Sequence, residues 1–388
     1  MTSPSNSLVH GFDRLLPTYP RAEVTIVRGE GARVWDDDER AYLDFGGGIA
    51  VVGLGHCHPG PLAAAQEQLE RLWHASNLYR TEPAAALAAR LSDRFGGAQA
   101  FLCNSGAEAI EAALKYARKS TGKPGIVALE GSFHGRTLGA LSVTGQPSKR
   151  AAFTPLLPGV RFVPPNDVAA LRTAVTTDVG LVLLEPILGE GGVHPLEPEF
   201  LAAAAELPAL LCLDEIQTGV GRTGSFFAFE ALGVRPDLVT LAKSLANGLP
   251  IGALLVADHA IGAFAPGDHG STFGGNPVTC AAACAVVDAI DEELLVNVLA
   301  RGAELAEGLA LLPGIRSVRG RGLLLGAVVD GGAADVVEAC RERGLLVLAA
   351  GDDVVRLAPP LMIGADDVTE ALSILAAALG QVDSRIYR

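Results

Sequence analysis

The sequence predicts an α/β protein, with a mostly parallel sheet covered by helices and a second, smaller α+β domain. The 388 residues are 49% hydrophobic and 19% charged, which allows a large core and more than one domain. Short apolar runs alternate with helical stretches rich in Ala, Leu and Glu, as expected for strands that are buried on both faces. The two flanks show a different pattern of hairpin-like runs and long helices.

Five apolar runs in the middle of the chain are predicted to be strands, and each ends at a polar or Gly-rich segment. The runs are 100–103, 126–129, 181–184, 210–213 and 238–242. In open parallel sheets, ligands bind at the carboxyl ends of the strands. We therefore expect one pocket to gather residues near positions 104, 130, 185, 214 and 243.

The flanks predict a domain that is built from both chain ends. Alternating runs at 23–27 and 33–35 suggest hairpin strands, and helices alternate with short strands from about residue 290. The predicted division is an N-terminal part of the small domain, a large domain and a C-terminal part of the small domain, at 1–45, 46–288 and 289–388.

Charge and composition exclude several classes of protein. A net charge of −14 disfavours nucleic acid as a partner, because an acidic surface repels phosphates. No long apolar run lacks charges or turn residues, so no membrane span is expected. Met1–Ser7 has no signal-peptide pattern, and the six cysteines form no CxxC pair, which fits the reducing cytoplasm.

Two short patterns suggest other chemistry, but the first offers too few metal ligands and the second has the wrong spacing. His56 and His58 could share a metal, but zinc needs three or four ligands and no second cluster is evident, so no metal is expected. The Gly-rich segment Gly320–Gly326 has one residue too many for a dinucleotide-binding fingerprint. A nicotinamide-dependent dehydrogenase would rest on this near miss alone.

A helix start after the first predicted strand has the features of an anion site. Ser105 and Glu108 have the spacing of a capping box, and free N–H groups at such a start face a bound anion. The alternative is a plain helix cap. Further along, Glu111 and Lys115 have the spacing of a helical ion pair.

Asp214 and Lys243 are the strongest candidates for chemistry. A carboxylate at a buried strand end, such as Asp214, is costly unless it is paired. A lysine in apolar surroundings, such as Lys243, loses its proton more easily and becomes a nucleophile, as Schiff-base lysines require. The alternatives are a structural cap for Asp214 and a lysine that extends to solvent for Lys243.

Six motifs in order resemble those of the class III aminotransferases, over about Tyr19 to Leu379. They are Asn104–Glu108, Phe133–Thr137, Glu185–Gly192, Asp214–Gly219, Ala242–Lys243 and Gly270–Pro277. The resemblance implies the fold type I architecture. That architecture has a large domain, with a mostly parallel seven-stranded sheet between helices, and a smaller α+β domain from both termini.

The resemblance also implies pyridoxal 5′-phosphate (PLP) as cofactor. Lys243 would hold it as a Schiff base and then move a proton, and Asp214 would pair with the ring nitrogen. Gln217 would contact the phenolic oxygen side, and Phe133 would stack on the ring. The phosphate would be held by Ser105, Gly106, Ala107 and, in a homodimer, by Thr272 of the neighbouring subunit.

Substrate recognition is implied for five further residues. Arg136 would grip a substrate carboxylate with its planar guanidinium. Glu190 and Arg356 would form a gate: paired, they admit the amino donor, and apart, they free Arg356 for 2-oxoglutarate. Tyr19 and Ser271 would line the substrate site.

The expected reaction moves an ω-amino group from a small-molecule donor to 2-oxoglutarate. The compact length and the segments around Tyr19, Asn77–Tyr79 and Phe133–Thr137 most resemble family members that act on N2-acetylornithine, which implies N-acetylglutamate 5-semialdehyde and glutamate as products, in arginine biosynthesis. Other donors stay open, namely ornithine, succinyl-diaminopimelate, carrier-linked lysine-pathway intermediates and 4-aminobutyrate. Two rival hypotheses are a different reaction on the same scaffold, as in an aminomutase, racemase or decarboxylase, and a non-catalytic scaffold protein.

Overall fold

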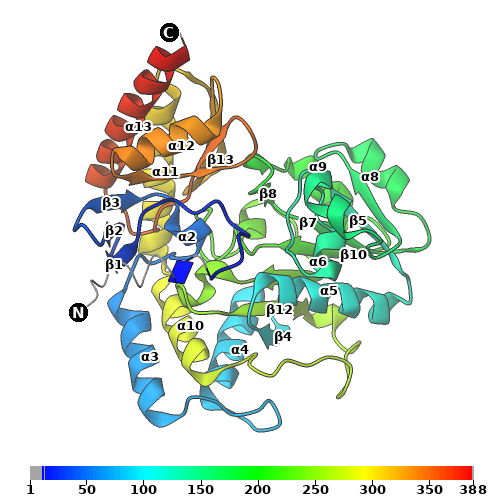
Figure 1. Cartoon of the computed structure of the whole chain (residues 1–388). Helices are drawn as coiled ribbons and strands as arrows, with labels where there is room; N and C mark the ends of the chain where they lie inside the picture. The colour runs from blue at the N-terminus through cyan, green and yellow to red at the C-terminus, as the bar shows by residue number, and fades with distance from the viewer. Residues whose placement is uncertain (1–10, 13, 387–388) are drawn as a thin grey trace.

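The computed structural model describes residues 11, 12 and 14–386, with side chains up to residue 382. The prediction for Met1–Ser7 lies outside this part. Figure 1 shows a broad sheet flanked by helices, with a second group of strands and helices above it in that view.

A seven-stranded sheet forms the centre, in the order β4-β12-β11-β10-β7-β5-β6. The strands are β4 (Ala98–Cys103), β5 (Gly125–Leu129), β6 (Val160–Val163), β7 (Val179–Leu184), β10 (Leu210–Asp214), β11 (Leu238–Leu241) and β12 (Gly252–Ala257). β12 pairs antiparallel with both of its neighbours, and the other pairs are parallel. The five predicted strands are therefore confirmed, and β6 and β12 were not predicted.

The sheet is buried on both faces because its strands are almost continuously apolar. In β5, Ile126 and Ala128 join one core cluster, whereas Val127 and Leu129 join the other. Alternate residues of a strand point to opposite faces, so both faces need a cover of helices. The helices of this part are α2 (Gly47–Ala50), α3 (Pro59–Arg71), α4 (Glu82–Phe95), α5 (Gly106–Thr121), α6 (Leu138–Ser142), α7 (Pro147–Arg150), α8 (Val168–Ala174), α9 (Pro198–Ala205) and α10 (Pro277–Ala289).

The two flanks of the chain meet in a smaller sheet, in the order β1-β2-β3-β15. β1 (Ile26–Glu30), β2 (Arg33–Asp36) and β3 (Ala41–Asp44) are antiparallel neighbours, and β15 (Leu345–Leu346) runs parallel to β3. The first strand thus begins three residues later than the run at 23–27 suggested. The domain boundaries at 45 and 288 stay a prediction.

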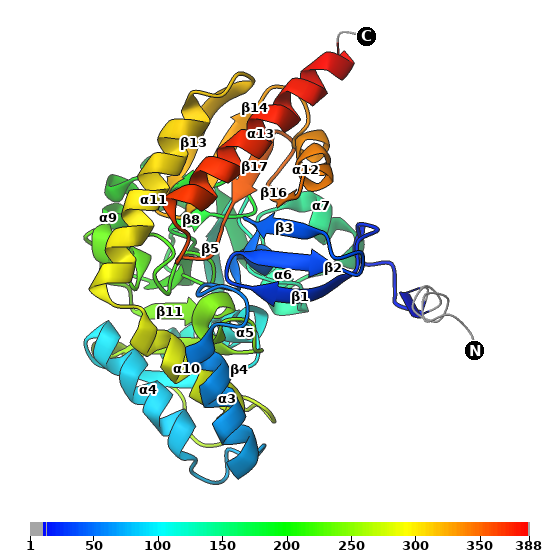
Figure 2. The same cartoon turned by 90° about the vertical axis from the view of Figure 1, so that its left-hand side faces the viewer.

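A third sheet, β13-β14-β17-β16, packs with the C-terminal helices (Figure 2). Its strands are β13 (Ile315–Arg321), β14 (Leu324–Val329), β16 (Leu348–Ala349) and β17 (Val354–Leu357). The helices are α11 (Glu292–Ala310), α12 (Ala333–Glu342) and α13 (Ala365–Ile386). β17 is fully buried and carries Arg356, so this sheet supplies a charged side chain to the interior.

The two histidines of the candidate metal pattern have separate roles. His56 Nε2 lies 2.8 Å from Asp44 Oδ2, and His58 Nδ1 accepts from the Gly60 N–H at the start of α3. Cys57 between them has φ 51°, so the two histidines do not lie on one face of an extended strand. Among the described residues, no group of three metal-binding side chains occurs, and no helix is long and apolar enough to cross a membrane.

Candidate active site

A cavity of about 430 Å³ lies at the carboxyl ends of the parallel strands. Four of the five predicted positions supply lining residues, because the loops after β4, β7, β10 and β11 open here. After β5 the lining residues start at Phe133, so position 130 itself is not part of the wall. The lining includes Asn104, Ser105, Gly106, Ala107, Phe133, His134, Gly135, Arg136, Glu185, Asp214, Ile216, Gln217, Ala242 and Lys243.

The start of α5 forms one wall. Ser105 Oγ accepts from the Glu108 N–H at 3.2 Å, while the Glu108 carboxylate accepts from the backbone and side chain of Asn104. The predicted capping box is therefore only half formed: the Glu108 carboxylate accepts from the N–H of Asn104, one residue before the N-cap residue Ser105. The N–H groups of Gly106 and Ala107 are in the first turn and have no acceptor within the helix, so they can bind an anion.

Gly106 is required for the shape of this wall. An added Cβ would lie 2.7 Å from Cδ1 of Ile216, which is closer than real Cβ contacts come. The missing side chain therefore lets Ile216 approach the start of α5. Ile216 lines the cavity together with Phe133, so apolar side chains from two different loops are available to contact a flat ring.

Asp214 ends β10 and is held by three groups. Its Oδ2 lies 2.6 Å from His134 Nδ1, and its Oδ1 accepts from the Thr240 hydroxyl and the Ile216 N–H at 3.1 Å. The other ring nitrogen of His134, Nε2, is buried and has no partner among the described residues. His134 thus fixes the orientation of Asp214, a role that its place beside Phe133 in the sequence did not reveal.

Lys243 follows β11 and faces the cavity. Its φ of 42° is in the left-handed region, which a residue with a side chain adopts only under constraint from its surroundings. Burial, with a further contribution from the nearby Arg356, lowers the pKa of Lys243 to about 8. The neutral, nucleophilic form of this amine is therefore far more populated near neutral pH than that of an ordinary lysine.

Phe133 and Arg136 lie in the loop between β5 and α6, which forms another part of the cavity wall. The Arg136 guanidinium lies 5.6 Å from the centre of the Phe133 ring, and Lys149 Nζ lies 4.7 Å from it. Arg136 is exposed and makes no ion pair with a described residue, so its planar group is available to a carboxylate. Phe133 and Arg136 both line the cavity.

The predicted gate residues are in contact. Arg356 donates to Glu190 at 2.8 Å and to Gln217 at 3.1 Å, although the three residues are far apart in the sequence. Arg356 is buried, whereas the Glu190 side chain is 24% exposed. Burial opposes ionisation of Glu190, but the charge and hydrogen bond of Arg356 outweigh it and lower the pKa of Glu190.

Glu190 and Arg356 do not line this cavity themselves but adjoin it through Gln217, and the remaining predicted residues lie outside it in the single chain. Thr272 and Ser271 line a second cavity of about 500 Å³, which shares Asn104 with the first. Ser271 Oγ accepts from Asn104 Nδ2 at 3.1 Å. Tyr19 is 69% exposed and does not line the first cavity.

Glu185, Glu215 and Arg222 are buried charged residues to which the sequence assigned no role. The Arg222 side chain donates to the carbonyl groups of Leu323 and Pro359, so it ties the loop after β10 to the C-terminal sheet. In the sequence, the one feature that could have indicated the burial of these three residues is their position within or next to an apolar segment.

Comparison with known proteins agrees with this geometry over nearly the whole chain. The family model for class-III aminotransferases matches residues 17–379. The acetylornithine aminotransferase of Streptomyces coelicolor is 51% identical over 367 residues, covering 92% of this chain and 91% of that protein. That of Gloeobacter violaceus is 48% identical over 378 residues, covering 93% and 94%.

Solved structures give the same result. The N-acetylornithine aminotransferase of Stenotrophomonas maltophilia has a TM-score of 0.84 at 39% identity, covering 98% of this chain and 99% of that one. The ornithine aminotransferase of Toxoplasma gondii, described with partial occupancy of PLP at its active site, has a TM-score of 0.93 at 33% identity, covering 100% and 97%. The fold and its strand-end cavity thus define an aminotransferase of fold type I. The chain belongs to the class-III aminotransferase family.

Proposed function

We propose that this protein is a PLP-dependent aminotransferase that acts on N2-acetylornithine and 2-oxoglutarate. The products are N-acetylglutamate 5-semialdehyde and glutamate, as in arginine biosynthesis. The observation that carries the proposal is a half-buried Lys243, with its pKa lowered to about 8, in one cavity with Asp214. The acetylornithine aminotransferases at about half identity support the choice of donor.

The cavity residues fit PLP. The first-turn N–H groups of Gly106 and Ala107, with Ser105, would hold the phosphate. Phe133 and Ile216 would contact the ring, Gln217 its phenolic oxygen side, and Asp214 the ring nitrogen. A carboxylate that His134 already orients suits a cationic ring nitrogen. When bound, PLP supplies an aldehyde that reacts with amines and a ring that withdraws electrons.

The protein side chains supply the acid–base chemistry and the positioning. The Lys243 Nζ atom is a base with a pKa close to the working pH, suited to take the proton from the carbon that bears the donor's amino group. Arg136 holds the distant carboxylate of the donor. While Glu190 is paired with Arg356, its carboxylate neutralises the guanidinium, so the donor amine meets no free positive charge there. Once Glu190 and Arg356 separate, Arg356 binds a carboxylate of 2-oxoglutarate.

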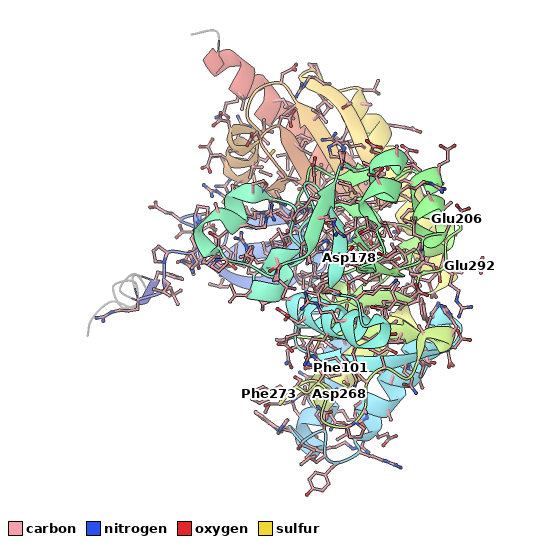
Figure 3. The ribbon with its side chains drawn as sticks, turned by 90° about the vertical axis from the view of Figure 1, so that its right-hand side faces the viewer. Phe101, Asp178, Glu206, Asp268, Phe273 and Glu292 are labelled. Atoms are coloured by element: carbon pink, nitrogen blue, oxygen red, sulfur yellow. The ribbon has the colours of Figure 1, made fainter. Side chains whose placement is uncertain are left out.

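We also propose a homodimer in which Thr272 completes the phosphate site of the partner. Thr272 is next to Phe273 in the chain, and the proposed apolar patch consists of the exposed side chains of Leu72, Trp73, Leu78, Tyr79 and Phe273. Trp73 is 70% exposed and Phe273 61%, which is unusual for large apolar side chains unless a partner covers them. Figure 3 shows Phe273 in the lower part of the molecule in that view, with the Asp268 label beside it.

Hydrogen bonds hold the two segments of the patch together. Asn77 Nδ2 donates to the carbonyl groups of Ser271 and Gly274, and Asn276 Nδ2 donates to that of Trp73. The patch therefore has its shape before any partner binds.

Tyr19 and Ser271 are proposed to line the substrate entrance once two chains meet. We further propose a cytoplasmic location and the three-part domain division at residues 45 and 288.

A panel of amino donors tests the proposed function. N-acetylornithine, ornithine, succinyl-diaminopimelate and 4-aminobutyrate are each mixed with 2-oxoglutarate, and kcat/KM is compared. N-acetylornithine should give the highest value. A higher value for another donor would refute the substrate, and no glutamate from any donor would refute aminotransfer itself.

A further inference from the structure

Glu185 is a buried carboxyl group in the cavity wall without a cationic partner. It follows β7, is 4% exposed, and forms no ion pair with any residue that the structure describes. Burying a carboxylate in this way is costly. A residue of this kind is expected to have a role that a neutral side chain cannot fill.

Its two oxygens hold two separate loops. Oε1 accepts from the Phe133 N–H at 2.8 Å, and Oε2 accepts from the Gly189 N–H at 3.1 Å. The first loop carries the ring that faces the cavity, and the second leads directly to Glu190. Only a carboxylate presents two acceptors and no donor, so it can hold both N–H groups at once.

Gly189 is also packed against the gate. An added Cβ at Gly189 would lie 2.5 Å from Cδ of Gln217, so the backbone touches that side chain. Gln217 accepts from Arg356, and Arg356 donates to Glu190. The bond from Glu185 to Gly189 therefore fixes the backbone on which the gate contacts depend.

We propose that Glu185 is a positioning residue that couples the Phe133 loop to the Glu190–Arg356 gate. This inference rests on the proposed function, because it concerns how the gate is set for the two substrates. Movement of the Phe133 loop on ligand binding is transmitted through the two bonds to the Gly189 backbone and so to the pairing of Arg356.

The titration of Glu185 supports this role. Burial, with a smaller contribution from Asp214, raises the pKa of Glu185 to about 7, and His134 acts in the opposite direction. Lys149 and Lys243 are the other charged groups that interact with it. The protonated carboxyl has lost one acceptor position to its own proton, so the coupling weakens as the pH falls through about 7.

Hydrogen exchange of the protein without cofactor tests the two bonds. In Glu185→Gln, measured at pH 8, the amides of Phe133 and Gly189 should both exchange about tenfold faster, because each loses a charged acceptor. Glu215→Gln is the matched control, since Glu215 is equally buried and accepts from the N–H groups of Ala228 and Phe229 outside the cavity. It should affect those two amides instead.

Steady-state kinetics test the coupling. Glu185→Gln should raise the KM for 2-oxoglutarate about tenfold at pH 8, with a smaller change in kcat, and should remove the rise in KM that we expect of the wild type below pH 7. Glu215→Gln should leave both features as in the wild type. Glu185→Asp, which cannot reach both loops, replaces Glu185→Gln if that variant does not fold.

Unchanged exchange at Phe133 or Gly189 would overturn the inference, as would a wild-type KM and pH profile in Glu185→Gln. An equal KM shift in Glu215→Gln would overturn it too, since the effect would then follow from lost stability. Absence of aminotransfer by the wild-type protein would refute the proposed function instead, and the exchange data would still report on the two bonds.

Discussion

Removing Glu190 should destabilise the protein more than removing Glu190 together with its partner. Glu190→Ala leaves the Arg356 guanidinium buried with only Gln217 as acceptor on that nitrogen, and its Nε already has no partner among the described residues. Loss of one partner from a buried ion pair costs about 3–5 kcal/mol. Because the Glu190 side chain is 24% exposed, we expect the lower end, about 3 kcal/mol.

The double variant Glu190→Ala/Arg356→Met contains no uncompensated charge and should lose less than Glu190→Ala alone. Urea denaturation of Glu190→Ala, Arg356→Met, the double variant and the wild type, with the m-values compared, gives the free energies of unfolding. The reasoning is refuted if the double variant is destabilised by the sum of the two single losses, within about 0.5 kcal/mol. Glu190→Ala should also lower the KM for 2-oxoglutarate, since Arg356 has lost its competing carboxylate.

Three further predictions follow from individual contacts. Lys243→Ala should abolish glutamate formation. In the wild type, kcat should fall as the pH drops below about 8, because the Lys243 amine becomes protonated there. A kcat that stays constant from pH 6 to 9 would contradict this. Gly189→Ala should lower kcat/KM about tenfold or more, because the new Cβ displaces Gln217, whereas Gly380→Ala on α13, with open space around it, should be neutral in the same assay. Phe273→Asp should give inactive monomers in analytical ultracentrifugation; an active dimer would rule out the apolar patch as the interface.

The strands of the central sheet could be predicted because burial on both faces leaves a continuous apolar run. β7, with the sequence Val-Gly-Leu-Val-Leu-Leu, is buried at every position. Hydropathy does not encode direction, so it could not show that β12 runs antiparallel between β4 and β11. β6 was missed because Arg161 interrupts its apolar pattern.

Within the site, positions at strand ends were predictable and side-chain partners were not. Asp214 and Lys243 line one cavity because Asp214 ends β10 and Lys243 follows β11, its neighbour in the sheet. The spacing of Glu111 and Lys115 predicted an ion pair, but this was wrong. Glu111 instead accepts from the Thr137 hydroxyl and two backbone N–H groups, and Lys115 donates to the 268–269 segment. These tertiary partners offer more hydrogen bonds than a surface pair, which contributes little.

The interleaved strand order has a consequence for how the protein is made. The residues between Asn104 and Lys243 reach one edge only after β4, β12, β11, β10 and β7 are assembled side by side, and Arg356 arrives with β17 still later in the chain. A fragment that ends before β17 lacks Arg356, and one that ends before β12 leaves β4 without its neighbour in the sheet. A chain truncated before residue 356 therefore lacks one half of the gate, and activity in a sample is expected only from molecules in which both sheets are complete.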